Sequence, residues 1–171
     1  MERITLEQVH ALYRQLTESL IDSDTSISTM ESCTSGLIAS LITDTEGASV
    51  IIKGSLISYS NDVKVQFGIP AETIEQFGVY SPQTAEAMAE QAGRLFHSTV
   101  SIGVTGSFGN PDPANSDSVP GRIFYAIKVQ DDITVRELLL EEPGNRFDCK
   151  LQTAYRIGLT LQELLRSRTG I

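Results

Sequence analysis

The sequence predicts a single-domain α/β sandwich with a mostly parallel sheet and a C-terminal antiparallel hairpin. Three observations support this fold class. Segments with helical periodicity alternate with short β-prone runs, which is the order typical of a sheet packed against helices. Residues 99–105 form a continuously apolar run, as expected of a buried parallel strand. Two later runs, 122–130 and 133–141, meet at Asp131-Asp132 and indicate the hairpin.

The first half of the chain is predicted to contain one long helix followed by short elements. Residues 5–21 place apolar side chains three and four positions apart, and Thr5 precedes a glutamine by three residues, which is the pattern of a capping box. Gly54 indicates a bend in a strand. The short elements are a strand over 26–30, a helix from Leu37 to Thr43, a strand over 50–59, a helical turn from Asn61 to Phe67 and a helix over 71–77.

The second half is predicted to contain two long helices. Ser81-Pro82 is a strong helix start, because proline suits the first helical position, and this helix is expected to run to about His97. A loop rich in Gly, Pro, Asn, Ser and Asp covers residues 106–121, and the last helix is expected over 147–168. The inner face of the helix that starts at Pro82 is expected to be mostly small, because alanines predominate among its residues Ala85, Met88, Ala89, Ala92 and Phe96.

Length and composition are those of one globular domain over residues 1–171. The chain is 40% hydrophobic and 20% charged, which excludes a disordered tail and a coiled-coil rod. No apolar run approaches the ~18 residues of a membrane span and no basic n-region opens the chain, so we expect a cytoplasmic protein without a membrane partner. The net charge of −9, without a basic cluster, predicts no nucleic-acid partner but leaves room for a small anionic ligand.

The cysteines and histidines predict no metal site, disulfide framework or Ser-His-Asp hydrolase. Two of each are present, and they are scattered along the chain. His10 is interpreted as a surface residue and His97 as a residue at a helix end. Residues 34–43 lack the arginine that a phosphatase loop would need, so Cys33 is expected to be buried rather than nucleophilic.

Polar side chains follow three predicted strands, at the sheet edge where α/β proteins bind ligands. Ser32 precedes a helix whose N–H groups can hold an anion or an oxyanion, although a serine there is also an ordinary N-cap. Lys64 is either a solvated charge or, beside a serine, a general base. The base role requires burial and neighbours that lower a lysine pKa from about 10.4 toward about 7–8. A Ser/Lys pair is the most economical nucleophile and base that this chain offers.

The third loop, from Thr105 to Pro111, carries glycines after the buried strand. Loops of this composition are common, so the pattern alone is weak. It matches neither a Walker A loop nor a GxGxxG fingerprint. We therefore expect no nucleotide cofactor.

Five short motifs in a fixed order resemble the C-terminal domain of CinA, the nicotinamide mononucleotide deamidase family. They are Glu31-Ser32-Cys33-Thr34-Ser35-Gly36, Ser58-Tyr59-Ser60-Asn61-Asp62-Val63-Lys64, Phe77-Gly78-Val79-Tyr80-Ser81, Val104-Thr105-Gly106 and Pro120-Gly121. The resemblance extends from about residue 5 to residue 166, and the ordered set is specific although each motif is short. Members of the family occur alone or fused to a second domain, and here only the deamidase-like domain is recognised.

The resemblance implies a serine amidohydrolase that converts nicotinamide mononucleotide to nicotinic acid mononucleotide and ammonia. Ser32 matches the family's nucleophile, Lys64 its general base and Tyr59 an assisting tyrosine. Arg146 matches an arginine linked to the substrate, and a guanidinium suits a terminal phosphate. The residues assigned to substrate binding are Arg146, Thr105, Gly106, Glu31 and Thr34. We expect a small-molecule nucleotide substrate, no metal or cofactor, and a homo-oligomer.

Two loops depart from the family pattern. Ser35 stands in place of a glycine, and the run from Thr105 to Ala114 replaces Thr-Gly-Ile-Ala-Gly-Pro followed by glycines. We expect weak turnover of nicotinamide mononucleotide, because Phe108 folded inward would cover the pyridine position and Asp112 would repel a phosphate. Arg146 is alternatively a helix-start arginine that caps a surface acidic residue such as Glu141 or Glu142. The alternative functions are a non-catalytic nucleotide-binding or regulatory module and an amidohydrolase for another small amide.

Overall fold

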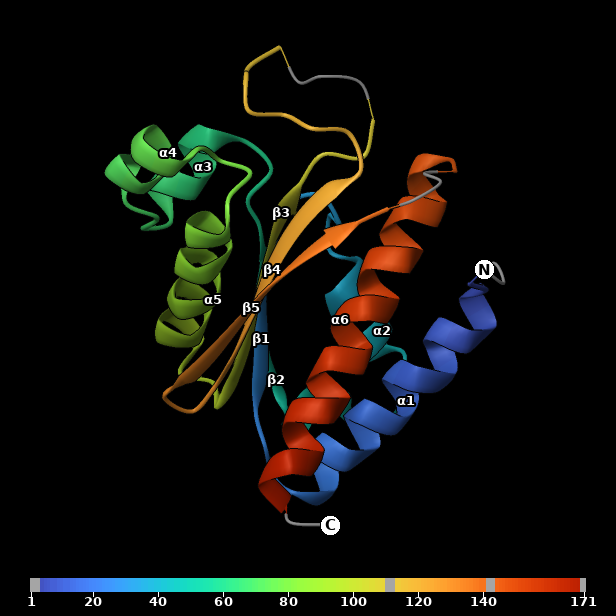
Figure 1. The fold of residues 1–171 in the computed structure, drawn as a ribbon. Coiled ribbons are helices and arrows are strands. Elements are labelled where there is room, and N and C mark those ends of the chain that lie inside the picture. The colour runs from blue at the N-terminus through green and yellow to red at the C-terminus, as the bar shows by residue number, and fades with distance from the viewer. Residues whose placement is uncertain (1–3, 110–112, 141–143, 170–171) are drawn as a thin grey trace.

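A single five-stranded sheet organises the molecule, as Figure 1 shows for the computed structural model, which describes residues 4–109, 113–140 and 144–169. The strand order is β2-β1-β3-β4-β5. The first three strands are parallel and the last two join them as an antiparallel hairpin, which confirms the predicted fold class. Their bounds are β1 Ile27–Glu31, β2 Ile52–Ile57, β3 Val100–Gly106, β4 Arg122–Val129 and β5 Asp132–Leu139.

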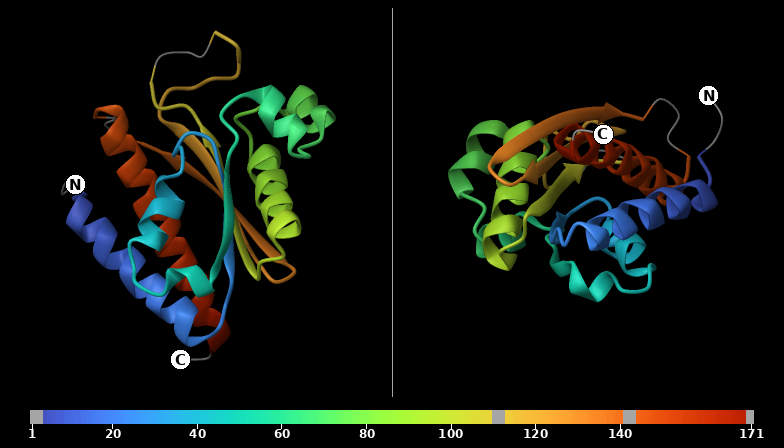
Figure 2. Two further views of the ribbon diagram at one scale, coloured as in Figure 1. Left: turned by 180° about the vertical axis from the view of Figure 1, so that it is seen from behind. Right: turned by 90° about the horizontal axis from the view of Figure 1, so that it is seen from below.

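Helices cover both faces of the sheet (Figures 1 and 2). One face carries α1 (Leu6–Asp22), α2 (Leu37–Thr43) and α6 (Arg146–Thr169), and a 3-10 turn, η1 (Ala48–Val50), precedes β2. The opposite face carries α3 (Asn61–Gln66), α4 (Ala71–Phe77) and α5 (Pro82–Phe96). The predicted capping box is present at the start of α1, where the side chains of Thr5 and Gln8 each accept the other residue's backbone N–H.

The two faces of the sheet are packed differently. Ile102 and Val104 of β3 point into the larger core, which α1, α2 and α6 cover. On the other side α5 lies close to β3, since Ala85 and Ala89 are small and Gly103 has no side chain. A Cβ at Gly103 would lie 2.3 Å from the Ala85 carbonyl oxygen. The predicted inner face of α5 is therefore confirmed, and its small residues allow this close approach.

Glycine placement also shapes the edge strand β2. The register with β1 shifts between Ile27 and Ser28, opposite the step from Ile52 to Gly54. A Cβ at Gly54 would lie 2.1 Å from the ring of Phe96, which occupies that space. The irregularity at Gly54 agrees with the predicted bend, and it lets the end of α5 pack against the sheet.

The hairpin turn lies one residue earlier than predicted. Asp132 pairs with Val129 and already belongs to β5, so Gln130 and Asp131 form the turn. Gln130 has a φ of 56°, which places it in the left-handed region. The sequence Asp131-Asp132 suggested a turn through its composition, whereas the cross-strand register decides the actual position.

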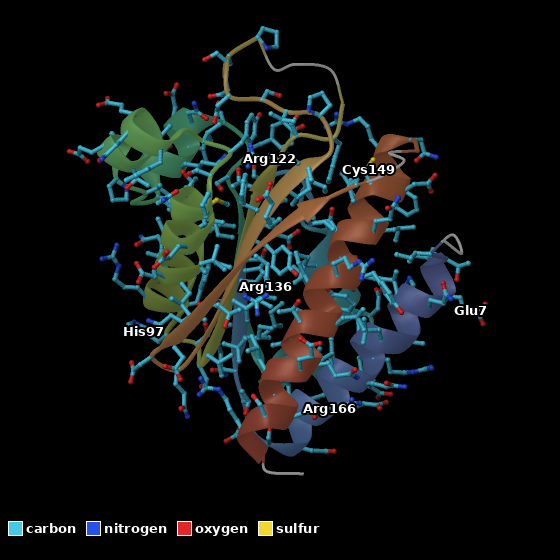
Figure 3. All side chains as sticks on the ribbon, viewed as in Figure 1. Glu7, His97, Arg122, Arg136, Cys149 and Arg166 are labelled. Atoms are coloured by element: carbon cyan, nitrogen blue, oxygen red, sulfur yellow. The ribbon has the colours of Figure 1, made fainter. Side chains whose placement is uncertain are left out.

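The carboxyl ends of β1, β2 and β3 meet at one edge of the sheet. The loop that follows β3, helix α3 and the first turn of α6 gather there, at the top of Figure 1. His97, which ends α5, lies at the opposite end of the molecule (Figure 3). The described helices include none that could cross a membrane. The described ranges also contain no cluster of three or more His, Cys, Asp or Glu residues suited to a metal ion.

Candidate active site

Ser32 and Lys64 meet at this edge of the sheet. Ser32 follows β1 directly, and Lys64 lies on α3, whose N-cap Ser60 accepts the backbone N–H of Val63. The Lys64 Nζ donates to Ser32 Oγ at 3.1 Å and to the carbonyl oxygen of Ser58 at 2.6 Å. Lys64 is only 1% exposed and Ser32 5%. The arrangement is a buried amine held against a nearly buried hydroxyl at the end of a parallel strand, as a serine nucleophile and its base require.

Thr105 and Gly106 end the neighbouring strand β3. The backbone N–H of Ser32 donates to the Val104 carbonyl at 3.1 Å, which places Thr105 beside Ser32. The Thr105 hydroxyl donates to the Val79 carbonyl at 2.9 Å and is buried. A Cβ at Gly106 would lie 2.6 Å from a β4 carbonyl oxygen, so this glycine packs against β4. Thr105 therefore lies beside Ser32, while Gly106 allows β3 and β4 to pack closely there.

Glu31 is a fully buried carboxylate that holds the start of α2. Its oxygens accept hydrogen bonds from three backbone N–H groups and two hydroxyls. The donors are Gly36 (2.9 Å), Ile38 (3.2 Å), Ala39 (3.0 Å), Thr34 Oγ1 (2.7 Å) and Thr29 Oγ1 (3.1 Å). The N–H groups that were expected to hold a ligand anion thus hold the Glu31 side chain instead. Glu31 and Thr34 were predicted to bind substrate. Their side chains instead hydrogen-bond to each other, and Glu31 fixes the turn between Ser32 and α2.

The substitution Glu31→Gln is expected to destabilise the fold strongly. The amide keeps one acceptor oxygen but turns an NH₂ group toward buried donors, and hydrogen bonds to a charged group contribute about 1.5–3 kcal/mol each. We expect the free energy of unfolding in urea to fall by about 2–3 kcal/mol. The exposed Glu75 of α4 provides the matched control, because its change to glutamine should stay within about 0.5 kcal/mol. Equal small effects at both positions would contradict this role of Glu31.

Cys33, the residue after Ser32, has a buried thiol. Its side chain is 4% exposed, as predicted. Burial, together with the nearby Glu31 carboxylate, raises the pKa of the Cys33 thiol from 9.0 to about 12. The thiol therefore stays protonated at neutral pH, where a thiolate would be needed for nucleophilic attack.

The raised pKa of Cys33 predicts a loss of stability in alkali. The unfolded chain releases the Cys33 proton near the ordinary thiol pKa of 9.0, whereas the folded chain holds it up to about 12. The contribution is therefore intact below about pH 9 and declines by about 1.4 kcal/mol per pH unit above it. Urea unfolding between about pH 8 and about pH 11 should show a steeper decline for the natural protein than for Cys33→Ala. Parallel declines would contradict the assignment.

Tyr59 and Arg146 form the second part of the candidate site. Asn145 caps α6, because its Oδ1 accepts the Asp148 N–H at 3.0 Å, and Arg146 is the first residue of this helix. The Arg146 guanidinium donates to the Tyr59 hydroxyl at 3.0 Å and lies over the ring of Phe108 at 5.9 Å from its centroid. Tyr59 follows β2 and Phe108 follows β3. Since β1 lies between these strands, the contacts of Arg146 span the strand end that carries Ser32.

The loop after β3 differs from the inward arrangement expected for it. The Phe108 side chain is 4% exposed and belongs to the larger core, where it supports Arg146. Asp112, expected to face a phosphate, lies outside the described residues. Further along, Asn115 accepts a hydrogen bond from Asn61 Nδ2 at 2.7 Å, and Asp117 accepts the Tyr80 N–H at 3.0 Å. These contacts join residues far apart in sequence, so no local pattern could have indicated them.

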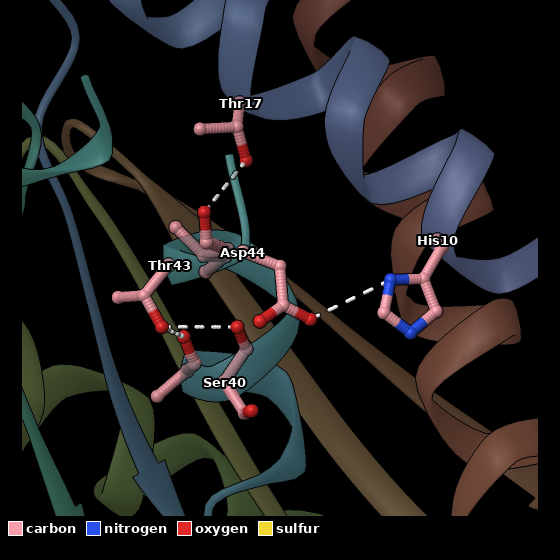
Figure 4. A network of polar contacts seen from close by, with 7 residues as sticks. His10, Thr17, Ser40, Thr43 and Asp44 are labelled. Carbon is pink, nitrogen blue, oxygen red and sulfur yellow. Dashed lines mark hydrogen bonds and ion pairs between the residues drawn. The ribbon is translucent and has the colours of Figure 1, made fainter. Parts of the chain in front are cut away.

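The two histidines are remote from the candidate site. His10 projects from α1, where its Nδ1 lies 3.5 Å from an Asp44 carboxylate oxygen, and both side chains are exposed (Figure 4). Beside them the Thr43 hydroxyl donates to carbonyl groups within its own helix, and Thr17 links α1 to the end of α2. His10 is thus a surface residue, as predicted, and its contacts connect two helices far from Ser32.

The fold and the site define an α/β protein with a buried serine–lysine contact at the carboxyl edge of its parallel strands. Residues 9–164 match the family model of the CinA C-terminal domain, and the chain belongs to this family. It is 35% identical over 145 residues to a "CinA-like protein" of Gemmatimonas aurantiaca, covering 84% of this chain and 32% of that protein. It is 34% identical over 154 residues to a "Putative competence-damage inducible protein" of Clostridium novyi, covering 90% and 35%. The chain thus spans about a third of the length of these curated relatives.

Solved structures have the same fold over nearly their whole length. The "competence/damage inducible protein CihA" of Agrobacterium tumefaciens has a TM-score of 0.85 at 27% identity and covers 96% of this chain and 99% of its own. A "competence or damage-inducible protein" of Enterobacter asburiae has a TM-score of 0.82 at 25% identity, with coverage of 93% and 97%. These matches and the family model confirm the family that the motifs indicated.

Proposed function

We propose that this protein is a Ser32/Lys64 amidohydrolase that deamidates nicotinamide mononucleotide. The observation that carries the proposal is the 3.1 Å contact between Lys64 Nζ and Ser32 Oγ in a setting nearly closed to solvent. A solvated surface lysine would not be 1% exposed, and a serine acting only as an N-cap would not contact it. Gly36 is the N-cap of α2, which leaves the Ser32 hydroxyl available for chemistry.

In the proposed reaction the neutral Lys64 amine takes the proton of the Ser32 hydroxyl while Oγ bonds to the carboxamide carbon. The hydrogen bond to the Ser58 carbonyl orients the amine toward Ser32. The proton then passes to the amide nitrogen and the C–N bond breaks. Ammonia is released, and the acyl group remains bound to Ser32 Oγ as an ester. Water cleaves this ester, which gives nicotinic acid mononucleotide and restores the hydroxyl.

Arg146 and Tyr59 are proposed to bind the nucleotide. Both side chains are exposed, unlike the dyad, and they span the strand end that carries Ser32. A guanidinium can hold a phosphate through two parallel hydrogen bonds, so the 5′-phosphate is the group that Arg146 would take. The buried ring of Phe108 supports the guanidinium at the distance of a cation–π contact. Charge at this position then adds to substrate binding rather than to bond cleavage.

Trapping with hydroxylamine tests the proposal. An acyl-enzyme on Ser32 partitions between water and hydroxylamine, so the purified protein should form the hydroxamate of nicotinic acid mononucleotide at the expense of the acid. Ammonia release per nucleotide consumed should not change. Formation of the acid with no hydroxamate would indicate direct attack by water. Absence of both products would favour the non-catalytic nucleotide-binding module.

A further inference from the structure

Ser58 lies beside the dyad with a hydroxyl that has no hydrogen-bond partner. The residue is fully buried, and its Oγ is the one buried side-chain oxygen or nitrogen without a partner among the described residues. Its backbone is well connected, since the N–H donates to the Glu31 carbonyl at 2.8 Å and the carbonyl accepts from Lys64. The unsatisfied group is therefore the hydroxyl alone.

The strand register places this hydroxyl on the same face as the nucleophile. β1 and β2 are parallel, and the hydrogen bond from Ser58 to the Glu31 carbonyl continues their ladder, so Ser58 stands next to Ser32. Side chains alternate along a strand, and Met30 and Leu56 each lie two positions earlier. These two residues pack in one cluster beneath α5. The side chains of Ser32 and Ser58 therefore project from the sheet on the face where α3 carries Lys64.

A buried hydroxyl without a partner is unfavourable, and alanine would fill the same backbone position without that penalty. Such groups in native proteins call for an explanation, and catalytic sites are one of the places where they occur. Here the hydroxyl belongs to the same residue as the carbonyl that Lys64 contacts at 2.6 Å. Rotation about the Cα–Cβ bond moves the Ser58 Oγ, and rotation about the Cβ–Oγ bond turns its hydrogen, so the hydroxyl can change its partner while the backbone stays fixed.

We propose that Ser58 is a positioning residue whose hydroxyl turns to accept a hydrogen bond from Lys64 when the amine takes the Ser32 proton. This inference rests on the proposed function. As Oγ of Ser32 bonds to the acyl carbon, its proton moves to Lys64 Nζ, which becomes an ammonium until the amide nitrogen takes the proton. A buried ammonium is costly, and a nearby hydroxyl oxygen stabilises it. The Ser58 hydroxyl thus acts in the charged intermediate rather than in the resting state.

The test is Ser58→Ala, measured by the rate at which a fluorophosphonate labels Ser32, by steady-state kinetics and by urea unfolding. Labelling needs proton transfer to Lys64 but not the nucleotide site. We expect labelling and kcat to fall about tenfold or more, with KM unchanged and stability not lowered, because the change removes a buried hydroxyl that has no partner. Ser101→Ala is the matched control, because Ser101 is buried on the same face of the sheet with its hydroxyl donating to the Ala89 carbonyl at 2.7 Å. That change should lower stability and leave labelling unchanged.

The outcomes separate the inference from the proposed function. If Ser58→Ala is labelled and turned over like the natural protein, Ser58 has no positioning role although the deamidase stands. If labelling depends on Ser58 but nicotinamide mononucleotide is not consumed, the inference holds and the substrate is wrong. If the natural protein reacts neither with the fluorophosphonate nor with the nucleotide, both fail. A parallel loss of stability and labelling in Ser58→Ala would show a structural role and overturn the inference.

Discussion

Ser32→Ala and Lys64→Ala are each expected to lower ammonia release from nicotinamide mononucleotide by about three orders of magnitude or more. In the proposed mechanism the two residues share one step, since Ser32 forms the ester and Lys64, 3.1 Å away, takes and returns its proton. Because the two residues act as one unit, the double variant should be scarcely slower than either single variant. Initial rates at several substrate concentrations measure this directly.

Two controls distinguish lost chemistry from lost folding. Lys64 is buried, so Lys64→Met, which keeps most of the side-chain volume, should fold and still be inactive. Lys53 is exposed and donates to the Val50 carbonyl in η1, so Lys53→Ala should retain activity. Moderate losses that multiply in the double variant would show that Ser32 and Lys64 act independently, and the dyad would be wrong.

Arg146→Lys is expected to raise the KM for nicotinamide mononucleotide by about ten- to a hundredfold while kcat changes little. Lysine keeps the charge, but it lacks the two parallel N–H donors with which a guanidinium binds a phosphate, and it loses the planar contact with Phe108. Nicotinamide riboside, which lacks the phosphate, should be affected far less. The comparison of both substrates in both proteins isolates the phosphate contribution.

Arg136, an exposed arginine on β5, provides the control for Arg146. Its change to lysine removes a guanidinium elsewhere on the surface and should leave both substrates unaffected. An equal loss on the nucleotide and the riboside in Arg146→Lys would remove the phosphate role. Arg146 would then act through its contact with Tyr59, and the alternative of a structural helix-start arginine would be favoured.

The elements of the fold could be predicted from local signals, and the position of the dyad from the topology of the sheet. The capping box at Thr5, the proline after Ser81 and the apolar run of β3 determine their elements from neighbouring residues. The dyad follows from topology, since residues after parallel strands converge at one sheet edge. Ser32 and Lys64 could therefore be brought together before their distance was known.

The support of the site could not be predicted, because it depends on long-range packing. Nothing in the sequence shows that the Glu31 carboxylate turns back to cap α2, or that Phe108 enters the core. The contact between Arg146 and Tyr59 joins residues 87 positions apart. No sequence pattern indicates that the Ser58 hydroxyl lacks a hydrogen-bond partner. This becomes apparent only from the positions of all the neighbouring donors and acceptors in the structure.

Ammonia release from nicotinamide mononucleotide by the purified protein tests the central claim most directly. The serine–lysine dyad predicts ammonia and nicotinic acid mononucleotide in equal amounts, with both lost in Ser32→Ala. This turnover should clearly exceed that of the Ser32 variant. Ammonia release no greater than that of Ser32→Ala at saturating nucleotide would contradict the claim.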